Sequence, residues 1–554
     1  MAMRCRSDGS IMSSGPDAMP ESSARGFAAV AGRFRVAIFV ALALVLTAWH
    51  VTAVLALGTA RIDGRTHFLI NDDEMITMRY GRNLASGAGL VYNSGERVEG
   101  FTSPLMALVM SGLHLLTVPP PVLPVFVQLM NLALSLAILF MLFGFFGGDD
   151  RSRLAGMIAG LFYVILPSHS YHAHAGFEVY MTAALLVWGI RRIERMTVPA
   201  ALLVGLLPLT HATAGAPWAV LVFAILVLGR GRPARALVVA GAAALPVVAW
   251  EVFRLAYYGA AFPNSFYLKA GAGTLAGGLE YLGGWLTSVS AIGILGLFAL
   301  VRWPDRKTVV LGACVVVQIV AAVSLGGDIF PQFRFLFPTS VLLCALAGWS
   351  VATLAGEWKG LPRPWRRLAV GLFVCAAAAP LQPIPEIARG VAISRHLKEW
   401  NVQHVAIGLA LRDNTPPGST VALFGLGYAG YYCGRPVIDM LGKVDARIAR
   451  VVPNRTRVIG HSKSDFDYVF SRAPDFVECG VDPAHLVKTV DLEIQRTGPW
   501  GYNAEMSLHP EFRRLYAPNP ARDAEGRFLL FYARSAEDVR TPWTAPEGVV
   551  RRLR

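Results

Sequence analysis

Two adjacent carboxylates, Asp72 and Asp73, open the most highly charged segment of an otherwise apolar chain of 554 residues. The segment runs from Asn71 to Ser103 and directly follows the first membrane-length apolar run, residues 34–58. A carboxylate at a membrane surface can act as a general base toward a lipid-borne substrate, or it can bind a divalent cation. Consecutive helix residues point about 100° apart, so the two carboxylates cannot face one atom in the same way. Their roles must therefore differ.

The same residues also fit the start of a helix. Asn71 or Asp72 can cap a helix that runs through about Leu84 and ends at Gly87 and Gly89. Acidic residues in the first turn are favoured by the helix dipole. In this interpretation one carboxylate caps the helix or holds Arg79 or Arg82. On the charge pattern alone, the capping interpretation is favoured over a catalytic one.

Further charged groups lie in other polar loops of the chain. Arginines and lysines there can bind a phosphate, although cations near membrane ends also extend to lipid headgroups. The candidates for phosphate binding are Arg254, Lys269, Arg334, His461 and Lys463. Glu178 lies at the start of an apolar run, where an unpaired carboxylate is costly. The candidate site therefore combines carboxylates with cations.

The composition places these groups in a multi-spanning membrane protein. Hydrophobic residues make up 54% of the chain, charged residues 16%, and the mean hydropathy is +0.47. Residues 1–33 are predicted to form a disordered cytoplasmic tail, and 34–384 a transmembrane catalytic domain whose first outer loop is 59–103. After the first run, apolar segments cover 103–118, 122–146, 154–168, 176–190, 197–210, 214–229, 234–253, 283–302, 307–325, 335–355 and 367–384.

Five basic connectors set the orientation in the membrane. By the positive-inside rule they are cytoplasmic: 149–153, 191–195, 229–235, 302–307 and 359–367. The loop of Asp72 and Asp73 and residues 385–554 then face the outside. Parity requires that one of the two runs flanking Pro119–Pro121 does not cross, and the short 103–118 run is predicted to be re-entrant or interfacial, which leaves about eleven crossings. The net charge of +14 needs no nucleic acid, because cytoplasmic loops that face anionic lipid account for much of it.

Residues 385–554 are polar enough to form an α/β domain outside the membrane. The segments 420–425 and 528–534 are typical of strands, and 396–412 has helical periodicity. The sequence GLGYAG at 425–430 matches a dinucleotide-binding pattern, but the outer side offers no NAD, so a tight strand-to-helix turn explains it better. The predicted fold class is an α-helical polytopic membrane protein with this C-terminal extracytoplasmic domain.

Cysteines and histidines add little chemistry. Cys433 and Cys479 share the outer domain, where they form either one disulfide or two separate thiols. The other four cysteines lie in apolar runs or in the tail and are predicted to be inert. His169, His172 and His174 lack the i, i+4 pairing of a helical metal site, and no carboxylate or cysteine completes them.

Five segments in order resemble one family. Residues 72–104 are similar to its signature DDA-x-I-x-x-R-Y-x-x-N-x-x-x-G-x-G-L-V-x-N-x-G-E-x-V-E-G-[YF]-T. The others are GFEVY (176–180), RLAYYGAAFPNSFYLK (254–269), GGDIFPQFRFLFP (326–338), and VIDMLGKVD (437–445) followed by GHSK (460–463). The family is that of the terminal arabinofuranosyltransferases of actinobacterial cell-wall arabinan, within the GT-C superfamily of polyprenyl-phosphate-sugar-dependent glycosyltransferases. The resemblance covers most of residues 35–470.

The resemblance implies a sugar transfer from a polyprenyl-phosphate donor, with arabinofuranose as the sugar, to a cell-envelope glycan at the outer face of the plasma membrane. Asp73 is the expected base, and Asp72 supports it or binds a divalent cation (Mg, Mn or Ca), although which Asp does which stays open. Arg254, Lys269, Arg334 and His461 would bind the donor phosphate. The supporting residues would be Arg79, Glu178, Tyr258, Asn264, Asp328 and Asp439. The outer domain would position the acceptor, and grooves between helices would hold the lipid tail.

Three departures from the family pattern limit this expectation. Glu74 replaces the usual Ala, Val179 follows Glu178 in place of Thr, and THATAG at 210–215 replaces a motif with a charged pair. These changes leave the sugar and acceptor open. One alternative is a GT-C transferase for another sugar, such as mannose. The alternative from a different class is a transporter of lipid-linked sugars, which would place its charges within broken helices near the membrane centre; a wall-anchoring scaffold is the non-enzymatic option.

Overall fold

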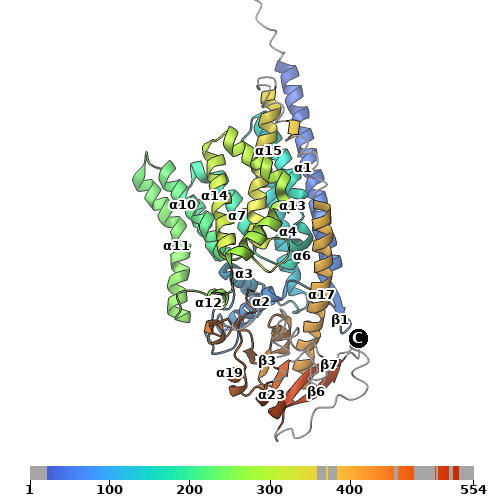
Figure 1. The fold of residues 1–554 in the computed structure, drawn as a ribbon. Helices are drawn as coiled ribbons and strands as arrows, with labels where there is room; N and C mark the ends of the chain where they lie inside the picture. The colour runs from blue at the N-terminus through green and yellow to red at the C-terminus, as the bar shows by residue number, and fades with distance from the viewer. Residues whose placement is uncertain are drawn as a thin grey trace, which may run out of the picture.

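The computed structural model describes residues 21–358, 370–371, 383–453, 459–478, 506, 509–522 and 528–535. A bundle of helices forms the upper part of the molecule, and a sheet with short helices lies below it (Figure 1). The fold is that of a polytopic, mainly helical protein with a C-terminal α/β unit, as predicted. The two parts meet in a layer that contains helices α2 (Asp72–Ala85), α3 (Pro104–His114) and α12 (Asn264–Lys269).

Long apolar helices build the bundle. Six helical segments are long and apolar enough to cross a membrane: Arg33–Leu57 of α1 (Glu21–Leu57), α4 (Leu123–Phe143), α11 (Pro233–Tyr258), α13 (Leu275–Arg302), α14 (Arg306–Ser324), and Arg334–Glu357, which joins the short η3 (Arg334–Leu336) to α15 (Phe337–Glu357). Helices α5 (Asp150–Val164) and α6 (His169–Ala175) are bent by 75° and count as a seventh if taken as one span. This count covers the described residues, and the predicted eleven crossings stay a prediction.

The remaining bundle helices are shorter. They are α7 (Val179–Arg192), η1 (Ile193–Arg195), α8 (Val198–Val204), α9 (Leu207–Thr210), η2 (Ala212–Ala214) and α10 (Gly215–Leu228). The 11-residue α3 is too short to cross, in agreement with the expectation for 103–118. Helix α1 begins before the predicted end of the tail at residue 33. The predicted crossing at 367–384 lies almost wholly outside the described residues.

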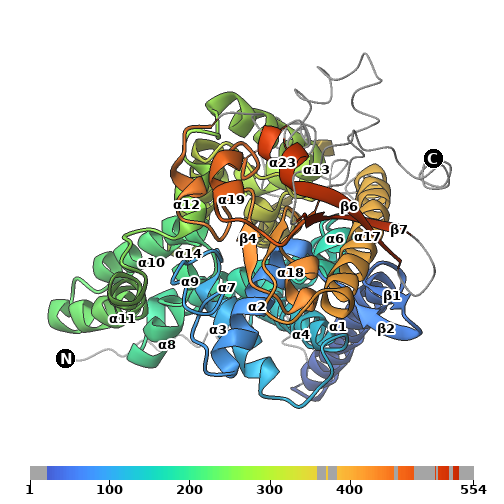
Figure 2. The same ribbon diagram turned by 90° about the horizontal axis from the view of Figure 1, so that it is seen from below.

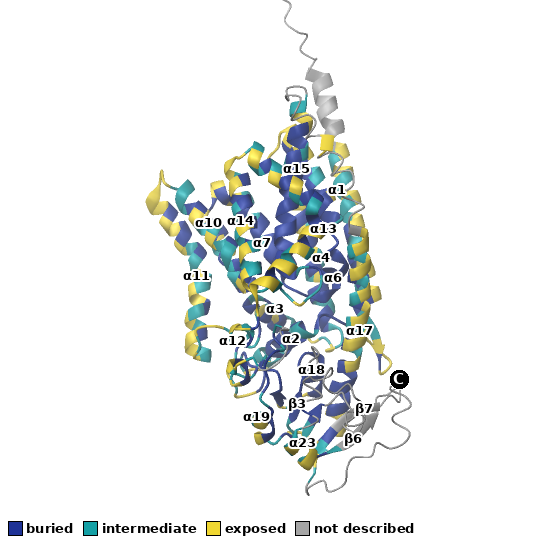
Figure 3. Ribbon diagram, viewed as in Figure 1, coloured by how far each residue is buried: buried dark blue, intermediate teal, exposed yellow. Residues whose placement is uncertain are grey.

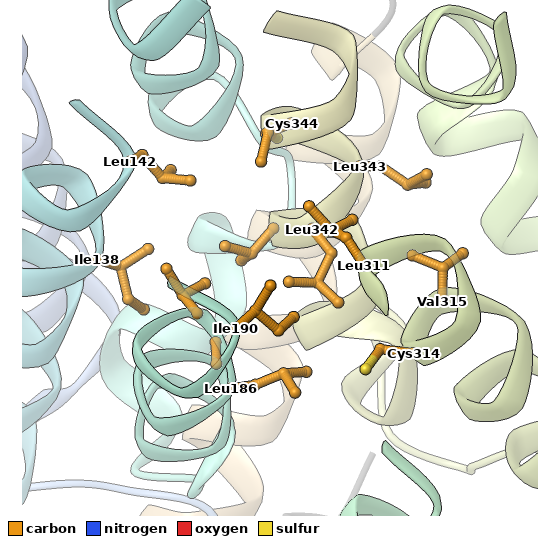
Figure 4. Close-up of a cluster of buried hydrophobic side chains, with 14 of the residues drawn as sticks. Ile138, Leu142, Leu186, Ile190, Leu311, Cys314, Val315, Leu342, Leu343 and Cys344 are labelled. Carbon is orange, nitrogen blue, oxygen red and sulfur yellow. The ribbon is translucent and has the colours of Figure 1, made fainter. Parts of the chain in front are cut away.

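The bundle core forms where four helices converge on apolar side chains. Figure 4 shows residues of α4 (Ile138), α7 (Leu186), α14 (Leu311) and α15 (Leu342) pointing toward one another, and each is almost fully buried. Helix α15 lies at the centre, and the outer helices α1, α10 and α11 carry exposed residues (Figure 3). Exposed Phe223 is one of many apolar residues on this outer surface. An apolar exterior around an apolar core identifies a multi-pass membrane protein.

The C-terminal unit contains a five-stranded sheet in the order β4-β3-β5-β7-β6. The strands are β3 (Val421–Leu423), β4 (Val437–Asp439), β5 (Phe476–Glu478), β6 (Tyr516–Arg522) and β7 (Phe528–Arg534). Strand β3 is parallel to both β4 and β5, whereas β7 is antiparallel to β5 and β6. The predicted strands at 420–425 and 528–534 correspond to β3 and β7. A separate hairpin pairs β1 (Thr59–Ile62) with β2 (Arg65–Phe68).

Helices accompany this sheet. They are α17 (Pro383–Asn414), α18 (Tyr428–Cys433), η5 (Ile448–Arg450), α19 (Phe466–Ser471) and α23 (Pro510–Leu515). One of them, α17, also contacts the bundle helices α1 and α6. Helix α17 contains the predicted helix 396–412 and packs on α18, which in turn packs on α2. Seen from below, α18 and β4 overlie α2 (Figure 2). Buried Ile76, Tyr92 and Leu426 share one apolar cluster between the two parts, so the sheet unit is docked on the first loop.

Candidate active site

Helix α2 begins as its sequence predicts. Asn71 is the N-cap, and its side chain accepts a hydrogen bond from the Asp73 backbone N–H at 3.0 Å. The Asn71 side-chain amide donates to the hydroxyl of Tyr171 at 2.8 Å, which ties the cap to α6. The capping function thus belongs to Asn71, and both carboxylates are available for other contacts.

Asp72 binds the C-terminal unit. Its carboxylate accepts hydrogen bonds from the backbone N–H groups of Gly427 and Tyr428, at 3.2 and 2.9 Å. These groups lie at the start of α18, where a negative charge is favoured. The alternative in which an Asp holds Arg79 or Arg82 is wrong for Asp72, because the backbone amides occupy its oxygens.

The glycines of 425–430 serve this contact. A Cβ on Gly427 would lie 1.9 Å from the backbone oxygen of Asp72, and one on Gly430 would lie 1.9 Å from the Tyr92 hydroxyl. Both positions therefore require glycine so that α2 and the following loop can approach the backbone closely. The segment joins β3 to α18, so the expected tight strand-to-helix turn is confirmed.

Arg79 holds the same interface by its guanidinium group. It donates to the backbone oxygens of Tyr92, Gly430 and Arg435 and lies 4.2 Å from the centre of the Tyr92 ring. These bonds link α2 to α18 and to the segment that follows it. The supporting function predicted for Arg79 stays a prediction, and its contacts are those of a connector between the two parts.

Asp73 faces the loop that follows β4. The ammonium group of Lys443 donates to Asp73 Oδ1 at 2.7 Å, and the Asp73 side chain keeps 35% of its surface exposed. Burial raises the pKa of Asp73, but the positive charge and hydrogen bond of Lys443 outweigh burial and hold the pKa at about 2. Asp73 is therefore an ionised carboxylate with one oxygen engaged and part of its surface accessible.

Two predicted residues hold the Lys443 loop. Asp439, at the end of β4, accepts hydrogen bonds from the backbone N–H groups of Leu441, Gly442 and Val444. The Asn264 amide of α12 donates to the backbone oxygens of Gly442 and Lys443 at 2.9 and 3.0 Å. Sequence reasoning missed Lys443 itself, although it lies inside the quoted segment VIDMLGKVD. No residue near Lys443 in the sequence marks it as the partner of Asp73.

Lys269 is a second lysine whose charge acts on the same site as Asp73. Among the described residues, no hydrogen bond or ion pair of its ammonium group is observed, whereas Arg334 donates to Asp328 at 2.8 Å. Burial, and then the charge of Arg334, lower the pKa of Lys269, while Asp328 and Asp73 oppose the shift. A lysine near other cations is suited to bind an anion, because their positive charges attract it together.

Arg334 is fixed more firmly. Its side chain is 4% exposed, is paired with Asp328, and lies 4.5 Å from the Phe177 ring centre. Its charge acts on Asp73, Glu74 and Glu178. The structure thus brings Asp73, Lys269, Arg334 and Asp328 into one polar cluster, and the functions predicted for these residues stay predictions.

His461 also lies near Asp73 and Lys443. Burial, together with the charge of Lys443, lowers the pKa of His461 to about 4, although Asp73 opposes this shift. The imidazole is therefore neutral at pH 7 and is a polar group rather than a cation. Lys463, another candidate for phosphate binding, is engaged in a different contact, because its ammonium group donates to the backbone oxygens of Tyr267 and Ala449.

Two buried carboxyl groups complete the cluster. Glu74 and Glu178 are 4% and 2% exposed, and each has one oxygen that lacks a hydrogen-bond partner among the described residues. Burial, and then the charge of Glu178, raise the pKa of Glu74. Such oxygens can accept hydrogen bonds from hydroxyl groups of a substrate.

Arg254 and Tyr258 lie in a different environment. Arg254 donates to Glu99 at 2.5 Å and also pairs with Glu251, while the Tyr258 hydroxyl donates to the backbone oxygen of Leu90. The backbone oxygen of Glu99 also accepts a hydrogen bond from the backbone N–H of Asn264, with 2.8 Å between oxygen and nitrogen. Phosphate binding by Arg254 stays a prediction, and the observed pairing favours a supporting role through Glu99 and α12.

In the part of the chain that the structure describes, no group of three or more His, Cys, Asp or Glu side chains could hold a metal ion. The Asp72 oxygens face backbone N–H groups, which compete with a cation at that carboxylate. His169 contacts Tyr180 and Tyr163, while His172 and His174 contact Gln332 and Ser394. A divalent ion at Asp72 stays a prediction, and Cys479 lies outside the described residues, so its pairing with Cys433 also stays one.

Comparison with known proteins confirms the resemblance seen in the sequence. The chain is 27% identical over 364 residues to a terminal beta-(1->2)-arabinofuranosyltransferase of Corynebacterium glutamicum, which covers 53% of this chain and 51% of the relative. It is 28% identical over 229 residues to the protein of the same name from Mycobacterium tuberculosis, covering 37% of this chain and 35% of that one. The chain therefore spans about half the length of the first relative and about a third of the second.

Solved structures show the fold, and one family model matches the C-terminal part of the chain. ArnT from Cupriavidus metallidurans, bound to undecaprenyl phosphate, matches with a TM-score of 0.54 and 15% identity over 90% of this chain and 98% of that one. The apo state of the same protein matches with a TM-score of 0.51 and 15% identity, covering 91% and 99%. Residues 392–527 match a domain of unknown function (DUF8728). The chain therefore has the GT-C fold.

Proposed function

We propose that the chain is a GT-C glycosyltransferase that moves a sugar from a polyprenyl-phosphate donor to a cell-envelope glycan. Its similarity to arabinofuranosyltransferases supports arabinofuranose as the sugar. One observation carries the proposal: the ionised, partly exposed carboxylate of Asp73 lies in the same cluster as Lys269, a cation with no observed partner among the described residues. A base next to an anion site is what sugar transfer from a phosphate requires.

The proposed reaction is a single displacement at the anomeric carbon. The acceptor hydroxyl oxygen bonds to this carbon while the carbon–oxygen bond to the phosphate breaks. The electron pair of the breaking bond leaves with the polyprenyl monophosphate, and the hydroxyl proton passes to Asp73. The positive charges of Lys269 and Arg334 offset the negative charge that grows on the phosphate. Inversion of the anomeric configuration follows from one displacement.

The fold also supports an outer location for this chemistry. Arg151 and Arg302, from two of the predicted cytoplasmic connectors, both lie within 4 Å of Glu357 at the end of α15, at 3.7 and 3.9 Å. The site and the sheet lie at the opposite, lower end of the bundle (Figure 1). With basic connectors inside, the site is extracytoplasmic. The C-terminal unit is then placed to hold the glycan acceptor.

The test is a transfer assay on purified full-length protein with a panel of polyprenyl-phospho-sugars, including arabinofuranosyl and mannosyl donors and an arabinan acceptor. We expect transfer from the arabinofuranosyl donor and none from an Asp73→Ala variant of equal thermal stability. Transfer of mannose alone would change the sugar. Absence of transfer from every donor would contradict the proposal.

A further inference from the structure

The ion pair between Asp73 and Lys443 presents a problem for catalysis. A general base works best when its pKa lies near the operating pH, yet Lys443 makes Asp73 a weak base. The lysine belongs to the C-terminal unit and the carboxylate to the first loop, 370 positions apart in the chain. Either this contact serves to dock the two parts, or it changes during the reaction.

Docking does not depend on this contact. Asp72 already binds the start of α18 by two backbone N–H groups, and Arg79 connects α2 with Gly430 of that helix and with Arg435 after it. The Lys443 backbone is held separately by Asp439 and Asn264. Among the described residues, the Lys443 ammonium group has no observed hydrogen bond besides the one to Asp73, so it can exchange partners while the loop stays in place.

The surroundings of Asp73 favour such a movement toward an anion. The charged and titratable groups that act on Asp73 or its lysine are Lys269, Arg334, His461, Glu74, Asp72 and Asp439. Lys269 and Arg334 mark where a phosphate would be attracted, and the charge of Lys443 already acts on Lys269. The Asp73 side chain is 35% exposed and that of Lys443 is 15% exposed, so the carboxylate is partly accessible beside a mostly buried lysine side chain.

We propose that Lys443 is a donor-responsive switch: it pairs with Asp73 while the site is empty and moves to the donor phosphate when the lipid binds. The phosphate gains a cation and Asp73 loses one, so the base strengthens only when the donor is present. No covalent bond is made or broken in this step. The inference rests on the proposed function, because it assumes that the phosphate belongs to a polyprenyl phosphate.

The first test is a double-mutant cycle on binding, which requires no transfer. Full-length protein in nanodiscs is titrated with polyprenyl monophosphate that carries no sugar, and separately with inorganic phosphate. Asp73→Asn should tighten lipid binding about tenfold, because Lys443 then has no competing partner, and Lys443→Gln should weaken it about tenfold. In the double variant the gain from Asp73→Asn should vanish. Lys398→Gln is the control, because this half-buried lysine of α17 donates to the Ala56 backbone oxygen at the end of α1.

Each outcome of the cycle has one meaning. If Asp73→Asn tightens binding equally with and without Lys443, the two residues act independently and the switch is wrong. If inorganic phosphate shows the same coupling as the lipid, the switch responds to phosphate alone, and the assignment to a polyprenyl donor is wrong. Lys443→Arg keeps a cation and should preserve the effect, which guards against a Lys443→Gln variant that folds poorly.

The second test uses the wild-type protein and needs no variant. The acid limb of kcat/KM reports the free enzyme, and that of kcat reports the donor complex. We expect the kcat limb to lie at least about one pH unit above the kcat/KM limb, and the two limbs to coincide in Lys443→Gln. Coincident limbs in the wild type would overturn the switch and leave the proposed transfer intact. Lipid binding with coupling but without transfer from any donor would overturn the transferase and leave the switch intact.

Discussion

Strands β3 and β4 are neighbours in the sheet. The loops that follow them hold the adjacent carboxylates Asp72 and Asp73 by different means. The β3 loop offers Asp72 two backbone N–H groups, whose positions are set by the fold. The β4 loop offers Asp73 one lysine side chain. Backbone donors stay fixed as long as the turn is folded, whereas an ammonium group on a four-carbon stem can exchange partners.

This difference separates a docking contact from a reactive one. Asp72 joins the two parts of the molecule, and Asp73 lies beside the cations of the proposed phosphate site. Adjacent residues on one helix acquire distinct functions because they point about 100° apart and meet different strands. The carboxyl ends of parallel strands are where α/β sheets place ligand-binding loops, and both contacts lie there.

The largest expected effect is that of Asp73→Asn. Loss of the proposed base should lower kcat for sugar transfer by about 10³-fold, because general base catalysis contributes roughly 10²–10⁴-fold. The unfolding temperature should change little, because the side chain is partly exposed and Asn keeps its shape. Steady-state kinetics and a thermal unfolding assay measure the two effects. A kcat within tenfold of wild type would remove Asp73 from the reaction.

Asp72→Asn should lower stability more than Asp73→Asn does and should lower transfer less. Its amide cannot accept from both N–H groups with the strength of a carboxylate, so stability should fall by about 1–2 kcal/mol. Transfer should fall only about tenfold, through weaker docking of the sheet unit. Gly427→Ala should resemble it, because a Cβ there meets Asp72, whereas Gly293→Ala in α13, which meets open space, is the control. An Asp72→Asn variant of native stability but without activity would instead place Asp72 in the reaction.

The smallest expected effect is a pH dependence of the stability of the β3 loop. Glu478 accepts hydrogen bonds from the N–H groups of Phe424 and Gly425 and lies 3.5 Å from His404 Nε2. Burial lowers the pKa of His404, but the hydrogen bond and charge of Glu478 outweigh it and raise this pKa above 6.5. The stabilisation is then complete below pH 6.5 and is lost as the pH rises through the higher folded-state pKa.

Between pH 6.5 and 9 the unfolding temperature of the wild type should fall by about 2–4 °C more than that of His404→Gln. The measurement is a series of thermal unfolding curves in matched buffers. His509→Gln is the control, because His509 pairs with the exposed Asp467 in a different part of the sheet unit. Parallel pH curves for wild type and His404→Gln would show that this pair does not stabilise the β3 loop.

Local patterns were sufficient for much of the fold. The helix after Asn71, the strands at 421–423 and 528–534, and the turn at 425–430 depend on neighbouring residues, so their sequences predict them. The resemblance placed Asp73, Lys269, Arg334 and Asp328 in one site, and the structure brings them together. Lys443 was missed because nothing near it in the chain indicates that it meets a carboxylate 370 positions away.

By itself, the sequence determined the membrane class, the two carboxylates beside the first span, and their cap, because hydropathy and capping act over a few residues. Tertiary structure alone decided which carboxylate meets which strand, that Arg254 is paired with Glu99, and that Lys443 reaches Asp73. These contacts join segments that are far apart in the chain. The packing of α18 on α2 accompanies the approach of the loop after β4 to Asp73, and Arg254 of α11 meets Glu99 of the first loop.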